Sequence, residues 1–386
     1  MTKKKLLPLL AAAVAALAVP GSGRAAVKVG FINTITGAEA PIGETMTNGL
    51  DLALEDLKKQ GVDLRVIRQD DTGKPDKAIS AIEQLATGDE VSAIVGPYTS
   101  QCANAVAKQA EQYGVPQVIP AASKEDITRQ GYKWVFRVNA PAHVYAHSLI
   151  DAAMSFGKPK SIAFIYESTD FGSSLSKVGK DYAVSKGLTV VADEAYQKGA
   201  PDYRSTLTKV KEKNPDLVFM VSYVADAILL MRQSREIGLK PQAFLGGGAG
   251  FDTSQFESER AISTNVFSVT QWTPDSGPGA ADFAARYEKR FGKPPTYHAA
   301  CTYTSMMVVG AAVKAAGGDR AKLRDALASG SWTTIMGPVK FETFEGFTNQ
   351  NKVAMPVIQY QDGKKVTVYP KAVAKKKAVY PFPAWK

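Results

Sequence analysis

The stretch IVGPYTSQCANAVA, residues 94–107, joins a buried strand to a helix through a turn of small and hydroxyl residues. Its apolar start, Val91 to Val95, is predicted to be a strand, and Thr99 or Ser100 begins the helix. Ligands of open parallel sheets collect at the carboxyl ends of strands. A hydroxyl at this turn therefore either caps the helix or binds a ligand carboxylate. The glycine of the turn, Gly96, is expected to let a ligand approach the backbone.

The same alternation of short apolar strands and amphipathic helices continues on both sides of this stretch. Such βαβ units form parallel sheets that are covered by helices on both faces. The alternation stalls between Pro116 and Arg137 and then restarts, which predicts an α/β protein with two similar, doubly wound lobes. The other predicted strands are Val27 to Ile32, Leu64 to Ile67, Ile162 to Tyr166, Thr189 to Ala192 and Leu217 to Val221; helices are expected over Gly49 to Lys59, Ala78 to Leu85, Phe283 to Phe291 and Thr302 to Ala316.

Residues 1–25 have the pattern of a secretory signal peptide. Three lysines precede an apolar run from Leu6 to Val19, and Gly23 and Ala25 stand at the −3 and −1 cleavage positions. The apolar run is too short to span a bilayer, and we expect no later segment to do so. No cysteine near the leader offers a site for a lipid, so release into the periplasm is favoured over anchoring.

The charge balance argues against nucleic acid as a partner. The formal net charge is +10, and removing the leader takes away four basic residues and leaves +6. Much of the remaining excess lies in the tail, residues 371–377, where solvated charge is usual. The two cysteines, Cys102 and Cys301, could form a disulfide or remain two buried thiols, and the sequence leaves both open.

No catalytic or metal-binding motif is complete, so we predict neither enzymatic activity nor a cofactor. His143 and His147 have the i, i+4 spacing of zinc ligands, but Val144 stands where a metalloprotease needs a glutamate. The glycine-rich run ends in Phe251 where a dinucleotide site requires its third glycine. We interpret the acids Asp70-Asp71 as polar residues at a strand end.

Taken in order, eight motifs resemble those of the periplasmic solute-binding proteins of branched-chain amino acid (Liv-type) ABC transporters, which have the type I periplasmic binding fold. The resemblance covers nearly the whole chain after the leader. The motifs are VGFINTITG at 29–37, DD at 70–71, IVGPYTS at 94–100, GVPQVIPAAS at 114–123, FR at 136–137, DFG at 170–172, MRQSREIGL at 231–239 and IMGP at 335–338.

The resemblance implies two lobes joined by a three-crossing hinge that closes over a solute. We expect the crossings near Ala121, Phe251 and Phe347. Residues 26–121 and 252–347 would then form the N-terminal lobe, and residues 122–251 and 348–386 the C-terminal lobe.

The resemblance also implies the ligand-binding residues. The solute carboxylate would be bound by the hydroxyls of Ser100 and Ser123 with neighbouring backbone N–H groups, and an aromatic residue, Tyr223, would line the site. The other positions that match the site are Tyr98, Thr99, Ala121, Ala122, Phe171, Ile42 and His298.

One departure from the family pattern concerns the solute. Amino-acid binders place an acid in the glycine-rich stretch, where this chain has Gly247-Gly248-Ala249. An unpaired buried ammonium is costly, so we expect an organic acid without an amine, such as an aromatic one, at a site that includes Gly248. A branched-chain amino acid remains the alternative, with Asp226, Asp170 or Glu44 supplying the missing charge.

The leading hypothesis is therefore a monomeric transport receptor that docks on a membrane permease with its ATPase. A ligand sensor of the same fold is a second possibility, since both would use the same closed form. An exported enzyme is a third, and it would lose activity when His143, His147 or Asp70 is changed.

Overall fold

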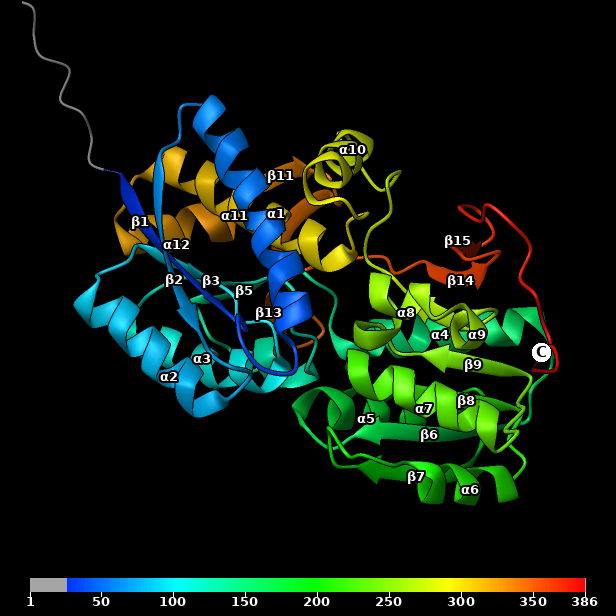
Figure 1. The fold of residues 1–386 in the computed structure, drawn as a ribbon. Coiled ribbons are helices and arrows are strands. Elements are labelled where there is room, and N and C mark those ends of the chain that lie inside the picture. Colours follow the sequence, from blue (N-terminus) through cyan, green and yellow to red (C-terminus); the bar gives the residue numbers. More distant parts are fainter. Residues whose placement is uncertain (1–25, 386) are drawn as a thin grey trace, which may run out of the picture.

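The computed structural model describes residues 26–385 and shows two α/β lobes side by side (Figure 1). The predicted signal peptide, residues 1–25, lies outside the described residues. Each lobe has a mostly parallel sheet between two layers of helices, as predicted. The sheets are mixed, because antiparallel strands from the last part of the chain are added at one side of each.

The first sheet has eight strands. Its parallel part runs from β13 to β2, while β12 lies antiparallel to both of its neighbours. The order is β11 (Ser331–Thr334), β12 (Gly337–Phe344), β13 (Phe347–Asn351), β5 (Val135–Arg137), β4 (Gln117–Ile119), β3 (Ala93–Val95), β1 (Val27–Asn33) and β2 (Leu64–Asp70).

Helices cover both faces of the first sheet because successive strand residues point to opposite sides. Phe31 packs toward α1 and α11, whereas Ile32 packs toward α2 and α3. The elements of these layers are α1 (Ala40–Lys59), α2 (Pro75–Glu83), the π-helix η1 (Gln84–Gly88), α3 (Ser100–Tyr113), η2 (Glu125–Thr128), α10 (Ala280–Phe291), α11 (Tyr297–Ala316) and α12 (Arg320–Ser329).

The second sheet has seven strands, with β14 and β15 antiparallel at one side. The order is β15 (Lys364–Tyr369), β14 (Val357–Gln361), β10 (Phe267–Val269), β9 (Ala243–Gly246), β8 (Leu217–Val221), β6 (Ser161–Glu167) and β7 (Thr189–Tyr196). One face packs against α4 (Ala142–Phe156) and α5 (Asp170–Ser185), and the other against α6 (Arg204–Glu212), α7 (Val224–Glu236), η3 (Ala249–Phe251), α8 (Ser254–Ser258) and α9 (Arg260–Ser263).

The chain crosses between the sheets three times, but each crossing lies later than predicted. The strand order places β5 in the first sheet, β10 in the second and β13 in the first. The crossings therefore follow Arg137, Val269 and Asn351, not Ala121, Phe251 and Phe347. The predicted lobe boundaries were wrong, because the segment between each predicted crossing and the observed one belongs to the other lobe. Strands β4, β5 and β10 have three residues each, too short to show the alternation by which strands are recognised.

Helix α11 is the one described helix that is long and apolar enough to cross a membrane. It packs instead as a core helix, because 72% of its most apolar window is buried and α1 lies against it. The two helices approach closely at Gly49, where an added Cβ would lie 2.3 Å from the backbone oxygen of Ala299. Both predicted helices on this interface begin earlier than expected, at Ala40 and Tyr297.

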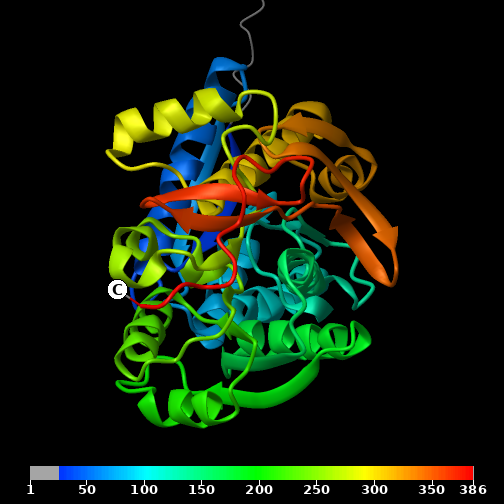
Figure 2. The same cartoon turned by 90° about the vertical axis from the view of Figure 1, so that its right-hand side faces the viewer.

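The segment after β15 runs across the second lobe (Figure 2) and is anchored there by aromatic side chains. The ring of Phe382 packs edge-on against Phe244, 5.0 Å away, and against Trp385, 4.8 Å away. Its backbone N–H donates to the oxygen of Gln242 at 2.6 Å. The tail that we interpreted as solvated charge is thus attached to the fold, while the lysines of residues 371–377 remain exposed.

The two cysteines are both buried and free, which decides the question that the sequence left open. Cys102 lies in α3 and Cys301 in α11. Burial raises the pKa of the Cys102 thiol to about 12, so this thiol stays protonated.

Candidate functional site

A small cavity lies between the lobes, at the carboxyl ends of the parallel strands, where the sequence predicts the ligand. Side chains from both lobes enclose it and leave about 10 Å³, roughly the room for one water molecule. The lobes are therefore closed, and a larger ligand enters only if they part. The lining residues are Tyr98, Ser100, Ala121, Tyr145, Phe171, Tyr223, Ala249 and Tyr297.

Five of the eleven predicted site residues line this cavity: Tyr98, Ser100, Ala121, Phe171 and Tyr223. The other six are buried nearby or on the same elements without lining it. These are Ile42, Thr99, Ala122, Ser123, Gly248 and His298.

Ser100 does not cap its helix, which answers the question raised by the turn. Helix α3 begins at Ser100, and the residue at the cap position, Thr99, makes no side-chain capping bond. The Ser100 hydroxyl oxygen instead accepts a hydrogen from the backbone N–H of Lys124 at 3.1 Å. Its own hydrogen is available to a ligand at the amino end of α3, where free N–H groups favour an anion.

The glycine of the turn is required by close packing of the backbone and not by the approach of a ligand, contrary to our expectation. Gly96 has φ +108°, and an added Cβ would lie 2.0 Å from the backbone oxygen of Ile32. Only glycine fits this approach between β1 and the turn. On the neighbouring strand end, the Ser123 hydroxyl is buried and has no partner among the described residues.

Aromatic rings form most of the cavity wall. The Tyr98 ring packs edge-on against Tyr223, 6.0 Å away, and against His298, 5.4 Å away. The Phe171 ring lies 5.5 Å from Tyr223. These packings suit a flat, apolar ligand group, because aromatic pairs favour edge and offset contacts.

Sequence reasoning missed three lining residues, namely Tyr145, Ala249 and Tyr297. Ala249 belongs to the glycine-rich stretch that we examined for a dinucleotide motif and for an acid. Tyr145 lies between the two histidines that we tested as zinc ligands, and Tyr297 precedes His298. Tyrosines are common in cores, so only their place beside predicted site residues could have singled them out.

No charged side chain lines the cavity within the part of the chain that the structure describes. The three acids considered as partners for an ammonium are engaged elsewhere. Asp170 pairs with the Lys124 amino group at 3.0 Å, and Glu44 is exposed and pairs with Lys293 at 3.2 Å. Asp226 accepts from the N–H of Gly199 at 3.2 Å, and its burial raises its pKa.

The imidazole of His298 adds no charge either. Its side chain is completely buried, and burial lowers the pKa to about 3, so the ring is neutral near pH 7. The Nε2 atom has no hydrogen-bond partner among residues 26–385. Any anion in the cleft is thus bound by neutral donors and backbone dipoles.

The glycine at 248 faces two of the missed tyrosines. It has φ +75°, and an added Cβ would lie 2.9 Å from Cε1 of Tyr145 and 3.7 Å from the hydroxyl of Tyr297. A glutamate placed here would therefore strain the backbone as well as add charge, so this substitution is a poor test of ligand charge.

Ion pairs and hydrogen bonds hold the lobes together around the cleft. The Lys198 amino group pairs with Glu39 at 2.8 Å and lies 5.0 Å from the centre of the Tyr223 ring. Lys124 reaches Asp170 across the cleft, and the N–H of Glu125 donates to the Ser174 hydroxyl at 2.9 Å. We call the pair Lys198–Glu39 the interlobe latch.

The motifs tested for catalysis have structural partners. His143 Nδ1 lies 2.8 Å from a carboxylate oxygen of Glu125, and His147 stacks on Tyr182 at 3.6 Å. Asp70 accepts bonds from the loop after β1, and Asp71 accepts one from the Thr34 hydroxyl at 2.7 Å. No group of three metal-ligating side chains occurs within residues 26–385.

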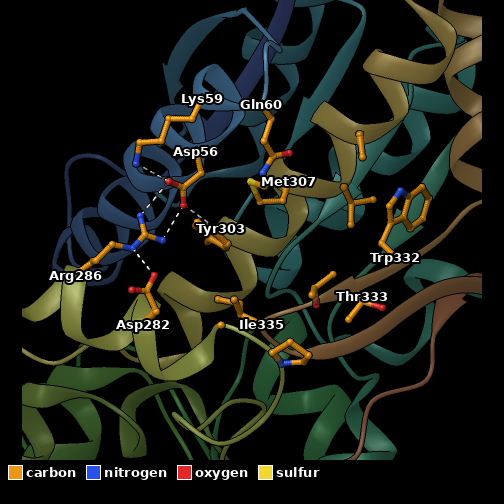
Figure 3. A pocket seen from close by; sticks show the side chains of 15 residues that line it. Asp56, Lys59, Gln60, Asp282, Arg286, Tyr303, Met307, Trp332, Thr333 and Ile335 are labelled. Atoms are coloured by element: carbon orange, nitrogen blue, oxygen red, sulfur yellow. Dashed lines mark hydrogen bonds and ion pairs between the residues drawn. The ribbon is translucent and has the colours of Figure 1, made fainter.

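A larger cavity of about 570 Å³ lies in the first lobe, between α1, α10, α11 and β11 (Figure 3). Its charged side chains are paired with one another. Arg286 bonds Asp56 at 2.7 Å and Asp282 at 2.8 Å, and the Tyr303 hydroxyl donates to Asp56 at 2.8 Å. All of its lining residues belong to one lobe, so closure of the hinge does not form it.

Comparison with known proteins identifies relatives along nearly the whole chain. Residues 26–365 match the family model described as periplasmic binding protein. The chain is 30% identical to Leu/Ile/Val-binding protein homolog 7 of Brucella suis biovar 1 (strain 1330), covering 96% of this chain and 98% of the relative. It is 31% identical to Leu/Ile/Val-binding protein homolog 8 of Brucella abortus (strain 2308), covering 90% and 91%.

Solved structures share the fold at lower identity. A leucine-binding protein from Thermotoga maritima MSB8 has a TM-score of 0.80 and 23% identity, covering 88% of this chain and 97% of that one. A solute-binding protein of an ABC transporter from R. palustris, in complex with benzoate, has a TM-score of 0.82 and 22% identity, covering 92% and 98%.

Proposed function

Because the chain belongs to the family of periplasmic binding proteins, we propose that it is the receptor of an ABC importer and binds a small carboxylate that lacks an amine. The family match and the two-lobe fold confirm the resemblance predicted from the motifs. Within the family, the solute is the open question. We favour an aromatic acid bound between the lobes by hinge closure.

The composition of the cleft wall is the main support for an amine-free aromatic acid as the solute. It combines four aromatic hydroxyl groups, one phenylalanine ring, one serine and two alanines, with no charged side chain. The Ser100 hydroxyl and the amino end of α3 supply donors for one carboxylate. The rings supply apolar surface for the rest of the ligand.

An amino acid is the competing solute, and the names of the Brucella relatives favour it. Burying its ammonium among neutral groups would cost several kcal/mol without a paired carboxylate. The nearest pairs, Lys198–Glu39 and Lys124–Asp170, already neutralise their acids. To pair with the ammonium of an amino acid, Glu39 or Asp170 would have to leave its lysine.

The transport role rests on family membership and on the predicted leader. We propose export to the periplasm through residues 1–25, release without a lipid anchor, and a monomer that presents its closed form to a permease and its ATPase. A membrane sensor would bind the same closed form. Deletion of a genomically linked permease distinguishes the two roles, because it should abolish solute uptake if the protein is a transport receptor.

A thermal-shift screen of residues 26–386 tests the proposal. Twenty amino acids are compared with aliphatic and aromatic carboxylates that lack an amine. A ligand at 100 times its dissociation constant adds about 2.7 kcal/mol of stability. Stabilisation by benzoate-like acids alone supports the proposal; stabilisation by leucine, isoleucine or valine alone overturns the choice of solute and leaves the binding-protein family intact.

A further inference from the structure

A buried cation without an ion pair lies at the edge of the first sheet that faces the cleft. Arg137 is the last residue of β5, and its side chain is completely buried. Burial lowers the pKa of the guanidinium to about 10, so the group stays charged near pH 7. Among residues 26–385, its hydrogen-bond partners are all neutral oxygens.

The two acids whose charge acts on Arg137 are engaged elsewhere. One carboxylate oxygen of Glu125 lies 2.8 Å from Nδ1 of His143 and pairs with the guanidinium of Arg129 at 3.3 Å. Asp126 is exposed and therefore solvated. A buried charge without a partner costs several kcal/mol, and a side chain needed only for its hydrogen bonds could be neutral. The charge of Arg137 itself thus requires an explanation.

The guanidinium donates to the loop after β4, which forms part of the cleft wall. Its Nη1 atom donates to the carbonyl of Lys124 at 2.7 Å and to that of Ala122 at 3.5 Å. Ala121 of this loop lines the cavity, and the N–H of Lys124 donates to the Ser100 hydroxyl at 3.1 Å. The loop therefore contacts both the guanidinium of Arg137 and the hydroxyl that we propose to bind the carboxylate.

The bonds to Arg137 also orient the N–H groups of the loop. A trans peptide directs its N–H opposite to its carbonyl. Since the Ala122 carbonyl points to Arg137, the N–H of Ser123 points away from it. Hydrogen bonds in a chain polarise one another, so the guanidinium makes the N–H end of this peptide more positive. The Ser123 hydroxyl beside it is buried and has no partner among the described residues.

Two further bonds fix the guanidinium against the loop. Its Nε atom donates to the side-chain carbonyl of Gln350 at 2.6 Å, and Nη2 donates to the Thr128 hydroxyl oxygen at 2.7 Å. The Gln350 amide in turn donates to the backbone oxygens of Asn139 and Asn351, at 2.8 and 2.7 Å. The position of the charge is therefore set by residues on both sides of the first and third crossings.

We propose that Arg137 is a specificity-determining residue whose buried charge, acting through residues 122–124, makes the cleft favour an anionic ligand over a neutral ligand of the same shape. Arg137 does not touch the ligand. It positions the loop and supplies the positive charge that the described cavity wall lacks. This inference rests on the proposed function only in that the ligand bears a carboxylate, so it applies to an amino acid as well as to an aromatic acid.

Calorimetric titration with benzoate and benzamide tests the role of the charge. The two ligands have similar shapes and differ in charge, so the ratio of their affinities measures the preference for an anion. Arg137→Gln should lower this ratio about tenfold relative to wild type, because a nearby positive charge favours an ionised carboxylate by that amount or more. Equal weakening of both ligands would show that Arg137 only holds the loop, and would overturn the inference.

The matched control is Arg320→Gln. Arg320 also donates to backbone oxygens, those of Ala86 at 2.7 Å and Val91 at 2.9 Å, but it does so before the amino end of β3, at the sheet edge opposite the cleft. Its affinity ratio should equal that of wild type. A fall as large as that in Arg137→Gln would mean that loss of any such arginine has this effect, and would overturn the inference.

A second pair of variants keeps Arg137 and changes only the charge beside it. Thr128→Asp places a carboxylate where Nη2 now meets the hydroxyl, and Thr128→Asn places a neutral amide of similar size there. Benzoate should bind Thr128→Asp about tenfold more weakly than Thr128→Asn, because the added acid neutralises the guanidinium. Equal affinities would overturn the inference. This pair decides if Arg137→Gln fails to fold or if benzamide binds too weakly to measure.

The wild-type protein separates failure of this inference from failure of the proposed function. If wild type binds leucine and no benzoate, the choice of solute is wrong, and leucine and leucinamide replace benzoate and benzamide in the same variants. The ratio then supports or overturns the role of Arg137 by the same criterion. If no carboxylate of the thermal-shift screen binds wild type, the proposed function is contradicted and the inference with it.

Discussion

At the scale of single residues, three hydroxyls of the cavity wall have oxygens that already accept a hydrogen bond from the protein. Ser100 is the clearest case, because it accepts from the N–H of Lys124 and faces the cavity. Its place after a strand and before a helix made it predictable from the sequence. Tyr145 and Tyr297 were not predictable in the same way, since only the fold brings them to the cavity and into contact with Gln271 and Ala249, which are distant in the chain.

Ser100→Ala should weaken binding of an aromatic carboxylate by about 1 to 3 kcal/mol, because the ligand charge loses one donor. Titration calorimetry measures the change. Ser176→Ala is the control, since Ser176 is a buried serine of α5 that does not line the cavity. Equal affinity of Ser100→Ala and wild type would remove Ser100 from the binding site.

The neutral, buried His298 should make stability fall in acid. Its pKa is about 3 in the folded state, below the usual 6.5, so between these values the unfolded chain binds the extra proton. Stability from this group is full above pH 6.5 and decreases as the pH falls, by on the order of 1 kcal/mol per pH unit.

Denaturant unfolding at several pH values between 7 and 4 tests this, with wild type compared with His298→Gln so that other titrating groups cancel. As the pH falls, the unfolding free energy of wild type should decrease more than that of His298→Gln. A constant difference would show that His298 titrates normally in the folded protein.

At the scale of elements, the long strands and the helices that follow them were predictable, because they carry regular apolar spacing. The prediction missed strands β4, β5 and β10, because three residues are too few to show a regular apolar spacing. Proline-rich or glycine-rich segments also lie near them. These strands decide where the chain changes lobes. The crossings were therefore misplaced although the two-lobe fold was predicted.

The packing of α1 on α11 gives a prediction at this scale. Gly49→Ala should destabilise the protein by about 1–3 kcal/mol, because the added Cβ meets the backbone of Ala299. Gly310→Ala on the same interface should cost less, since its Cβ meets the side chain of Leu57, which can rotate. Thermal unfolding of both variants measures the difference, and an equal or reversed order would contradict this account of the packing.

At the scale of the whole molecule, closure is stabilised by contacts between the lobes as well as by any ligand. The interlobe latch joins Lys198 to Glu39, whose side chain is only 4% exposed. The cavity enclosed by this closure holds little more than one water molecule. Opening must therefore precede binding of a ring-sized solute.

Lys198→Met should shift the ligand-free protein toward the open form, because Glu39 would otherwise remain buried without a partner. Small-angle X-ray scattering should show a larger radius of gyration than for wild type, and saturating ligand should reduce it. Lys177→Met is the control, since this lysine forms an exposed pair with Asp181 in α5. An unchanged radius in Lys198→Met would exclude the latch as a determinant of closure.

We propose above all that the cleft accepts a carboxylate and rejects an ammonium. The most direct measurement is calorimetric titration with 3-phenylpropanoate and with phenylalanine, two acids that share a carbon skeleton and differ by one amine. We predict that the amine-free acid binds more tightly, by tenfold or more, because no carboxylate lines the cavity. Tighter binding of phenylalanine would contradict the claim and would require an acid to move into the cleft.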